Sequence, residues 1–85
     1  MKIEMYTKTV CPYCIRAKNI LKLKGFSEII EYNLETNPEL RTELLERTLG
    51  AKTVPQIFIQ GKLIGGCQEL MDLDAKGELD TLLGR

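Results

Sequence analysis

The stretch Cys11-Pro12-Tyr13-Cys14 decides how the chain is interpreted, because it places two thiols at the point where a strand gives way to a helix. Residues 2–7 alternate polar and apolar side chains as a strand does, whereas the apolar positions from Pro12 to Lys24 fall at helical spacing and Gly25 follows them. Cysteines three residues apart lie on one face of a helix and can close a disulfide with little backbone movement. The sequence therefore predicts a strand, a loop, and a helix that begins at a pair of reactive thiols.

Of the two thiols, Cys11 is the predicted nucleophile and Cys14 the predicted resolving thiol. Cys11 stands at the helix start, where unpaired N–H groups and the positive end of the helix dipole favour a thiolate. Lowering a thiol pKa from about 8.5 to about 5.5 takes about 4 kcal/mol, and a helix end supplies at most about 2 kcal/mol. A further cation is needed, and Lys8, three residues before Cys11, is the best candidate, ahead of Arg16 and Lys18.

Two structural roles for the cysteine pair compete with redox chemistry. A structural disulfide is disfavoured because cytosolic proteins rarely keep one, and a bridge from i to i+3 closes too short a loop to stabilise much. A structural zinc site needs four ligands, but the chain has three cysteines and no histidine. The missing histidine also excludes Ser-His-Asp and Cys-His nucleophiles. Redox catalysis is therefore the favoured interpretation, and no metal is expected.

The rest of the chain continues the alternation of strands and helices within one domain, residues 1–85. The predicted elements are a strand at 29–34, a helix capped by Thr36 or Asn37 that ends near Gly50, a strand at 54–60, a further strand after a turn at Gly61-Lys62, and helices at 67–76 and 78–83. A two-residue turn makes the last two strands antiparallel. The order β-α-β-α-β-β-α implies an α/β fold, a small mixed sheet with helices on both faces.

Several other positions carry alternatives that the residues alone leave open. Pro55 fits the start of a strand and is structural on this basis. Gly65-Gly66, just before a helix, is either an anion cradle or only a turn. Cys67 is either activated by a helix start or a small buried hydrophobe, and Tyr13 either covers a bound peptide or simply faces solvent.

Length and charge narrow the class of protein to which the chain can belong. A chain of 85 residues with 44% hydrophobic and 28% charged residues has globular composition and room for one domain. Basic and acidic residues balance, so net charge gives no argument for nucleic acid or an anionic membrane. Residues 1–26, which hold the paired cysteines, nevertheless carry a net charge of +5, and residues 27–85 carry −5. No apolar run resembles a signal peptide or a membrane span, so a cytoplasmic protein is expected.

Three motifs together resemble the dithiol glutaredoxins of bacterial type. They are Cys-Pro-Tyr-Cys after Tyr6-Thr7-Lys8, then Thr-Val-Pro-Gln-Ile-Phe-Ile from Thr53, then Gly-Gly-Cys-Gln-Glu-Leu from Gly65. The resemblance covers nearly the whole chain, in order and at the family's spacing. It implies a thioredoxin fold with a four-stranded mixed sheet flanked by helices, Pro55 in the cis form facing the cysteines, and a first strand parallel to its neighbours. It also implies glutathione as the co-substrate.

The family's glutathione contacts can be carried over onto this sequence position by position. From the glycyl end to the γ-glutamyl end of glutathione, the implied contacts are Lys8, Tyr13, Thr53, Val54, Pro55, Gly66, Cys67 and Gln68. In this assignment Lys8 meets the glycyl carboxylate, Tyr13 flanks the sulfur, and Thr53 and Val54 hold the cysteinyl part by backbone pairing. The γ-glutamyl end is received by Gly66, Cys67 and Gln68. Many relatives have Asp where this chain has Gln68, so a neutral amide replaces the carboxylate that would meet the γ-glutamyl ammonium, and Glu69 is the candidate to compensate.

The resemblance predicts a glutathione-dependent thiol–disulfide oxidoreductase. Its substrates would be protein–glutathione mixed disulfides and protein disulfides, with ribonucleotide reductase as one candidate partner, and the chain would act as a monomer. One rival is an electron donor of thioredoxin type, reduced by a flavoprotein; against it, thioredoxins usually have Trp before the first cysteine, where this chain has Val10. The other rival is an iron–sulfur carrier, in which Cys11 and glutathione hold a cluster within a dimer.

Overall fold

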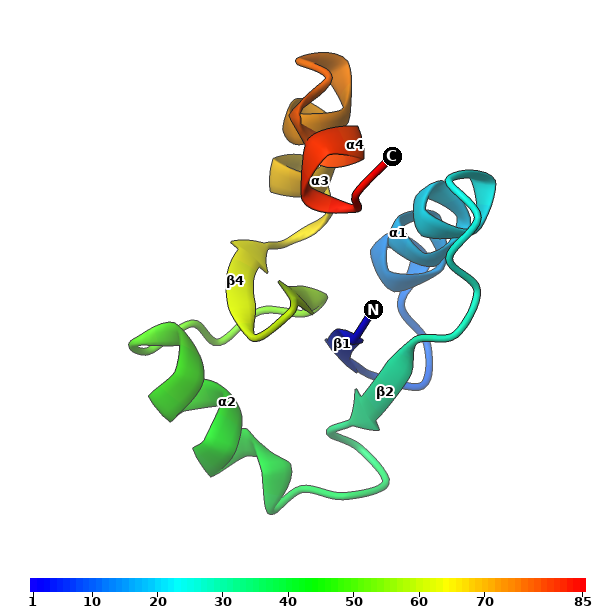
Figure 1. The fold of residues 1–85 in the computed structure, drawn as a ribbon. Coiled ribbons are helices and arrows are strands. Elements are labelled where there is room, and N and C mark those ends of the chain that lie inside the picture. Colours follow the sequence, from blue (N-terminus) through cyan, green and yellow to red (C-terminus); the bar gives the residue numbers. More distant parts are fainter.

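Four strands form one mixed sheet in the computed structural model, which describes residues 1–85 (Figure 1). The strands are β1 (Ile3–Thr7), β2 (Ile30–Asn33), β3 (Gln56–Ile59) and β4 (Lys62–Gly65), and their order in the sheet is β2-β1-β3-β4. The helices are α1 (Pro12–Leu23), α2 (Leu40–Thr48), α3 (Cys67–Ala75) and α4 (Glu78–Leu82). None of them is long and apolar enough to cross a membrane. The predicted α/β fold and order of elements are confirmed, with the last helical region divided at Gly77.

The two neighbours of β1 run in opposite directions. β2 is parallel to β1, whereas β3 is antiparallel to β1 and β4 is antiparallel to β3. The expectation of a first strand parallel to its neighbours is therefore correct for β2 and wrong for β3. Tyr6, near the end of β1, pairs with Gln56 at the start of β3. The connection through α2 leaves β2 and enters β3 at the same end of the strands, so β3 runs back antiparallel to β1.

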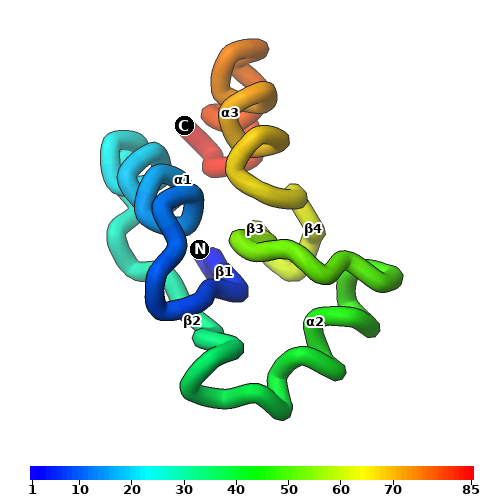
Figure 2. The backbone as a smooth tube through the Cα atoms, turned by 180° about the vertical axis from the view of Figure 1, so that it is seen from behind, coloured from blue at the N-terminus to red at the C-terminus, as the bar shows by residue number.

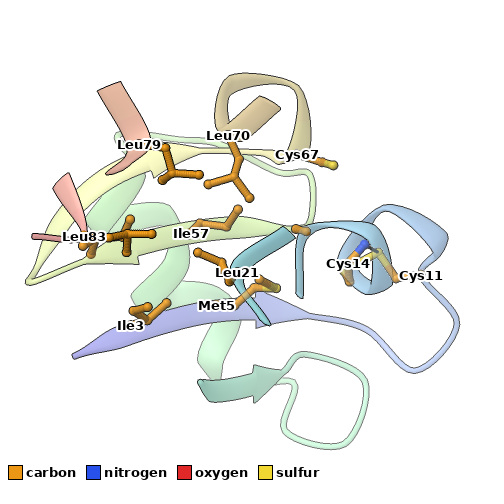
Figure 3. Close-up of a cluster of buried hydrophobic side chains, with 12 residues drawn as sticks. Ile3, Met5, Cys11, Cys14, Leu21, Ile57, Cys67, Leu70, Leu79 and Leu83 are labelled. Atoms are coloured by element: carbon orange, nitrogen blue, oxygen red, sulfur yellow. Dashed lines mark hydrogen bonds between the residues drawn. A yellow bond between two sulfur atoms is a disulfide. The ribbon is translucent and has the colours of Figure 1, made fainter. Parts of the chain in front are cut away.

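The alternation of side chains along β1 supplies two separate cores. The larger lies between the sheet and α1, α3 and α4, and its members include Ile3, Met5, Ala17, Leu21, Ile57, Ile59, Leu70, Leu79 and Leu83 (Figure 3). The smaller lies beneath α2 and contains Tyr6, Leu34, Leu44 and Phe58. Figure 2 shows α1 and α3 on one side of the sheet and α2 on the other, so the predicted helices on both faces are confirmed.

A buried polar network joins the sheet to α2. Arg47 donates from both terminal nitrogens to the Glu4 carboxylate, at 3.1 and 3.2 Å, and to the Tyr6 hydroxyl at 3.1 Å. The Tyr6 hydroxyl donates to Glu43, and the Tyr32 hydroxyl donates to Glu4 at 2.8 Å. The contact with Arg47 lowers the pKa of Glu4, while burial, reinforced by the bond to Glu43, raises the pKa of Tyr6 to about 12.

The start of α2 differs from the sequence expectation. The helix begins at Leu40 without a side-chain cap, so the prediction that Thr36 or Asn37 caps it is wrong. The side chain of Asn33 instead accepts hydrogen bonds from the N–H groups of Glu35 and Thr36, at 2.9 and 3.2 Å. This side chain closes a turn after β2 and uses the residues that the prediction assigned to the cap.

The turn between β3 and β4 also lies one residue earlier than predicted. Ile59 pairs with Lys62, so the two turn residues are Gln60 and Gly61 and not Gly61 and Lys62. Both have positive φ, 52° and 78°, as a type I′ hairpin turn requires. The antiparallel pairing itself is confirmed.

The C-terminal helices pack against the first strand and form salt bridges with the residue that follows the first helix. Leu79 of α4 packs in the same core as Ile3 of β1. The Lys24 ammonium, just after α1, lies 2.8 Å from a carboxylate oxygen of Asp74 in α3 and 3.1 Å from one of Asp80 in α4. These contacts hold α1, α3 and α4 together as one layer over the sheet.

Candidate active site

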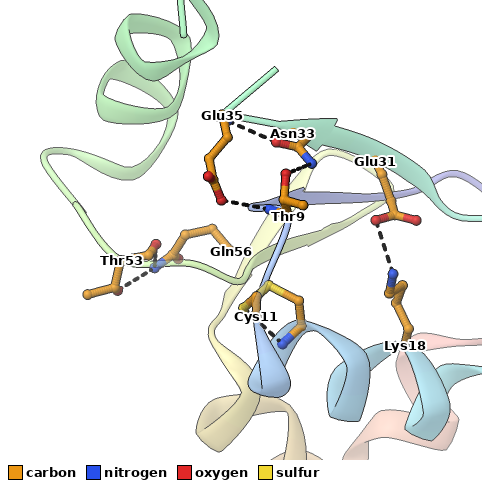
Figure 4. Close-up of a disulfide and its surroundings, with 9 residues drawn as sticks. Thr9, Cys11, Lys18, Glu31, Asn33, Glu35, Thr53 and Gln56 are labelled. Atoms are coloured by element: carbon orange, nitrogen blue, oxygen red, sulfur yellow. Dashed lines mark hydrogen bonds and ion pairs between the residues drawn. A yellow bond between two sulfur atoms is a disulfide. The ribbon is translucent and has the colours of Figure 1, made fainter. Parts of the chain in front are cut away.

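The two predicted active thiols form a disulfide at the start of α1 (Figures 3 and 4). Cys11 directly precedes the helix with extended backbone, and Pro12 takes the first helical position, for which its fixed φ is suited. The Cα atoms of Cys11 and Cys14 are 5.2 Å apart, and the Cys14 N–H donates to the Cys11 sulfur at 3.2 Å. The predicted pairing is confirmed, and the Cys11 sulfur lies where a helix start stabilises negative charge.

A groove of about 280 Å³ opens beside this end of α1. Its lining residues come from the start of α1, the segment before β3 and the start of α3, and they are Tyr13, Thr53, Val54, Pro55, Gly66, Cys67, Gln68, Glu69 and Met71. Every predicted glutathione contact except Lys8 belongs to this set. Tyr13, which stands between the two cysteines in the sequence, is 61% exposed and joins the groove to the disulfide.

Lys8 lines a second cavity, of about 310 Å³, that shares Thr53 and Val54 with the groove. Arg41 of α2 and Lys52 line this cavity too, and the sequence analysis singled out neither. Lys52 directly precedes Thr53, a predicted glutathione contact, so its position in the sequence could have identified it. Arg41 has no local signal, because its position depends on how α2 packs against the sheet. The structure thus gathers three cations at one end of the groove.

The segment before β3 is held by a side chain that the sequence analysis also missed (Figure 4). The Val54–Pro55 peptide bond is cis, as the resemblance implied. Gln56 is buried, and its side-chain nitrogen donates to the backbone oxygen of Thr53 at 3.1 Å and to the Thr53 hydroxyl at 3.2 Å. Gln56 therefore fixes the path of the backbone that lines the groove.

The loop between β1 and α1, which carries Cys11, is tied to β2 and the turn after it (Figure 4). The Thr9 N–H donates to a carboxylate oxygen of Glu35 at 2.8 Å, and the Asn33 amide donates to the Thr9 hydroxyl at 3.4 Å. Lys18 forms a salt bridge of 3.2 Å with Glu31 of β2. The charge of Lys18, one of the weaker candidates to stabilise the thiolate, is therefore directed toward β2.

The start of α3 approaches Pro55 closely because two glycines precede it. Gly65 has a φ of +116°, and a Cβ there would lie 2.9 Å from Glu69. A Cβ on Gly66 would lie 3.3 Å from the backbone oxygen of Pro55. The Glu69 carboxylate accepts a hydrogen bond from the Gly66 N–H at 2.6 Å, so an acidic side chain is held at the edge of the groove.

Cys67 and Gln68 occupy the first turn of α3 with different roles. Cys67 is 4% exposed, and burial raises the pKa of its thiol, which the positive charge of Arg16 opposes. Of the two alternatives for Cys67, the structure supports the small buried hydrophobe. Gln68 is exposed, and its amide donates to Asp72 one turn further along, at 2.9 Å.

Comparison with known proteins identifies the family. A family model described as Glutaredoxin matches residues 3–64. The chain belongs to the glutaredoxin family. Glutaredoxin 3 of Escherichia coli K12 is 51% identical over 81 residues, which cover 95% of both chains. The glutaredoxin of Pseudomonas aeruginosa is 47% identical over 81 residues, covering 95% of this chain and 94% of its own.

Solved glutaredoxin structures have the same thioredoxin fold. A glutaredoxin–glutathione complex from buckwheat superposes with a TM-score of 0.86 at 32% identity, covering 96% of this chain and 76% of the other. The glutaredoxin of Brucella melitensis superposes with a TM-score of 0.80 at 44% identity, covering 98% and 88%. Glutaredoxins are thiol–disulfide oxidoreductases, and this glutaredoxin is one, with Cys11 and Cys14 as its redox-active pair.

Proposed function

We propose that this glutaredoxin uses glutathione to reduce protein–glutathione mixed disulfides and protein disulfides. The observation that carries the proposal is the groove, in which the Thr53–Pro55 segment and the start of α3 face the end of α1 that bears the disulfide. Its volume, about 280 Å³, is close to the lower end of the range for small-molecule sites. The buckwheat glutaredoxin–glutathione complex, similar over nearly the whole chain, supports the same ligand.

The glycyl end of glutathione is a carboxylate, and the cavity beside the groove offers cations to bind it. Lys8, Arg41 and Lys52 line that cavity, and none of them forms a salt bridge within the protein. Charge-assisted hydrogen bonds from lysine or arginine to a carboxylate are about twice as strong as neutral ones. We assign Lys8 as the principal contact, with Arg41 and Lys52 assisting it.

The γ-glutamyl end carries both a carboxylate and an ammonium group, and the start of α3 suits both. The N–H groups of Cys67 and Gln68 stand in the first turn of the helix, where backbone donors lack helical partners and favour an anion. Glu69 uses one carboxylate oxygen to accept from Gly66, which leaves the other for the ammonium group. In this assignment Glu69 supplies the carboxylate that Gln68 lacks.

The cysteinyl part of glutathione would lie between these two ends. The Thr53–Pro55 segment would pair with it through the backbone of Val54, as one strand pairs with another. Tyr13 would cover its sulfur from the α1 side. These contacts would place the sulfur of the ligand beside Cys11. They would favour the reaction by orienting the two sulfurs more than by tightening the binding.

The reaction proceeds by thiol–disulfide exchange. With a mixed disulfide, the Cys11 thiolate attacks the glutathione sulfur, and the protein sulfur leaves as a thiolate that takes up a proton. The thiolate of a second glutathione then attacks the glutathione sulfur on Cys11, which gives glutathione disulfide and restores Cys11. With a protein disulfide, Cys11 attacks one sulfur and Cys14 then attacks Cys11, so that a reduced protein leaves and a Cys11–Cys14 disulfide remains. Two glutathione molecules reduce that disulfide.

The protein partners would be cytoplasmic proteins with an accessible disulfide or a glutathionylated cysteine. Ribonucleotide reductase, whose turnover consumes a dithiol, is one candidate of this class. The proposal includes a monomeric enzyme, because the groove and both flanking sets of polar groups come from a single chain.

One assay tests the proposed function against its rivals. The purified protein is given the small mixed disulfide of glutathione and 2-mercaptoethanol, together with glutathione, glutathione reductase and NADPH, and the consumption of NADPH is followed. We expect turnover that depends on both glutathione and Cys11. In a parallel reaction, thioredoxin reductase replaces glutathione and its reductase. Turnover only in the parallel reaction would identify a thioredoxin-type electron donor and refute the proposal.

A further inference from the structure

The solvent-facing side of α1 presents cations and apolar side chains but no acidic residue. Helical spacing places five residues side by side there, and we call them the α1 surface: Ile15, Arg16, Asn19, Lys22 and Leu23. All five are exposed, with Ile15 at 56% and Leu23 at 85% of their full areas.

The cations of the α1 surface have no partner within the protein. The basic residues that form salt bridges are Lys2, Lys18, Lys24 and Arg47. Arg16 and Lys22 form none, and the chain has no acidic residue from Met5 to Ser27. Glu31 of β2 lines a surface cavity with Ile15, Asn19 and Lys22, but it is paired with Lys18, so this side of the molecule keeps a net positive charge that attracts negative groups from solution.

The α1 surface begins at the redox-active pair. At about 1.5 Å per residue, Arg16 lies about 7 Å along the helix from Cys11, and Lys22 lies about 16 Å from it. An extended peptide advances about 3.3 Å per residue, so a segment running along α1 from Cys11 would meet Arg16 after about two residues and Lys22 after about five. A protein whose cysteine lies beside Cys11, as the sulfur that leaves a glutathione mixed disulfide or as the sulfur that Cys11 attacks in a protein disulfide, can therefore contact both cations with a short flanking segment.

We propose that the α1 surface binds acidic flanking segments of the protein substrates, with Arg16 and Lys22 facing carboxylates and Ile15 and Leu23 facing apolar side chains. This inference rests on the proposed function, since it concerns the protein that delivers the disulfide. Charge complementarity of this kind raises the rate of encounter and disfavours basic partners. An anionic membrane is the weaker match, because two cations give little of the attraction that polybasic segments provide.

The test compares two glutathionylated peptides of equal length and equal apolar content. One has Glu two and five residues from the cysteine on both sides, and the other has Lys at those positions. At low ionic strength we expect kcat/KM for the acidic peptide to exceed that for the basic peptide by about three- to tenfold. The ratio should fall toward one at high salt, because exposed charges are screened there.

A pair of matched variants locates the effect. The variant Lys22→Glu should bring the ratio toward one, while its turnover of the mixed disulfide of glutathione and 2-mercaptoethanol stays within about twofold. The control Lys62→Glu makes the same change in net charge at an exposed lysine outside the α1 surface, and it should keep the wild-type ratio.

The outcomes separate this inference from the proposed function. A wild-type ratio of one at low ionic strength, an equal loss in the control variant, or binding to phosphatidylserine vesicles without discrimination between the peptides would overturn the inference. Turnover of the mixed disulfide of glutathione and 2-mercaptoethanol would remain in each of these cases. Loss of that turnover in the wild-type protein would refute the proposed function instead.

Discussion

At the scale of single residues, the two cysteines of the disulfide differ in their places on α1. Cys11 precedes the helix and accepts a hydrogen bond from the Cys14 N–H, whereas Cys14 lies one turn inside. We expect Cys11→Ser to abolish the reduction of every substrate. Cys14→Ser should keep the reduction of glutathione mixed disulfides and lose the reduction of protein disulfides that need a second thiol, as measured by the coupled assay with each substrate. Equal inactivity of the two variants toward a mixed disulfide would refute the assignment of roles.

Lys8 has two proposed functions, which are to stabilise the Cys11 thiolate and to bind glutathione. Comparison with Lys52 allows the two to be separated. Lys8 is three residues from Cys11 in the sequence and also lines the cavity with Lys52. Lys8→Glu should raise both the pH midpoint of Cys11 alkylation by iodoacetamide and the KM for glutathione. Lys52→Glu should raise only the KM, by about two- to fivefold, as expected for a partly exposed ion pair. Lys62→Glu serves as the control, and an unchanged alkylation midpoint in Lys8→Glu would remove Lys8 from thiolate stabilisation.

Single residues also mark where sequence reasoning ends. Cys11, Cys14 and Pro55 could be predicted because their chemistry or backbone restriction is local and their motifs are short. Arg41 could not, because its place beside Lys8 depends on how α2 packs, and Gln56 could not, because only the folded chain shows that its side chain turns back to Thr53, three residues before it. Gln56 matters for the groove through its bonds to Thr53, and a buried glutamine at the start of a strand has no distinctive pattern in a sequence.

At the scale of secondary-structure elements, the start of α3 decides how the ammonium end of glutathione is met. Glu69→Gln should raise the KM for glutathione by about two- to fivefold, because it removes the carboxylate closest to that end of the groove. Gln68→Asp should lower the KM by a few-fold, because it adds a carboxylate there. Asp72→Asn removes a negative charge one turn beyond Gln68, outside the groove, and should leave the KM within about twofold. An unchanged KM in Glu69→Gln would exclude Glu69 from the γ-glutamyl site.

Tyr6, buried between β1 and α2, makes the free energy of unfolding depend on pH in the alkaline range. The pKa of Tyr6 is about 12 in the folded protein, against about 10 in an unfolded chain. Between these values the unfolded state has lost a proton that the folded state keeps, so stability falls as the pH rises, by roughly 2 to 3 kcal/mol over that window. Below pH 10 both states keep the proton, and this contribution is constant.

Urea unfolding at several pH values checks this dependence. Tyr6→Phe should lose less stability than the wild-type protein between about pH 10 and about pH 12, because it removes the group that titrates there. Tyr13→Phe changes an exposed tyrosine and should keep the wild-type slope. Identical slopes in wild type and Tyr6→Phe would mean that Tyr6 does not titrate differently in the two states.

The elements themselves were largely predictable, since their apolar periodicity and glycine stops are local. The errors fall where non-local or side-chain geometry decides. The direction of β3 depends on how α2 crosses the sheet, and the start of α2 depends on the side chain of Asn33. The positive φ of Gln60, which shifts the hairpin turn by one residue, is unusual for a residue other than glycine.

At the scale of the whole molecule, we expect a colourless monomer. Pro12 stiffens the chain beside Cys11 and lacks an N–H, and Cys14 competes for the same sulfur by forming the disulfide, so Cys11 is a poor ligand for a cluster shared between two subunits. Anaerobic purification with glutathione, followed by attempted reconstitution with iron and sulfide, tests this by visible absorption and sedimentation. A brown dimer with two irons per two chains would make cluster transfer the leading function.

The contact between the last helix and the first strand has a consequence for biosynthesis. Leu79 and Leu83 complete the core that Ile3 and Met5 begin, so the first strand of this domain needs residues of its last helical region, which are translated later. A nascent chain that has not yet reached Leu79 exposes the apolar side of its sheet, which is the kind of surface that chaperones bind and that aggregates. The complete core of the domain can therefore form only after Leu83 has been translated.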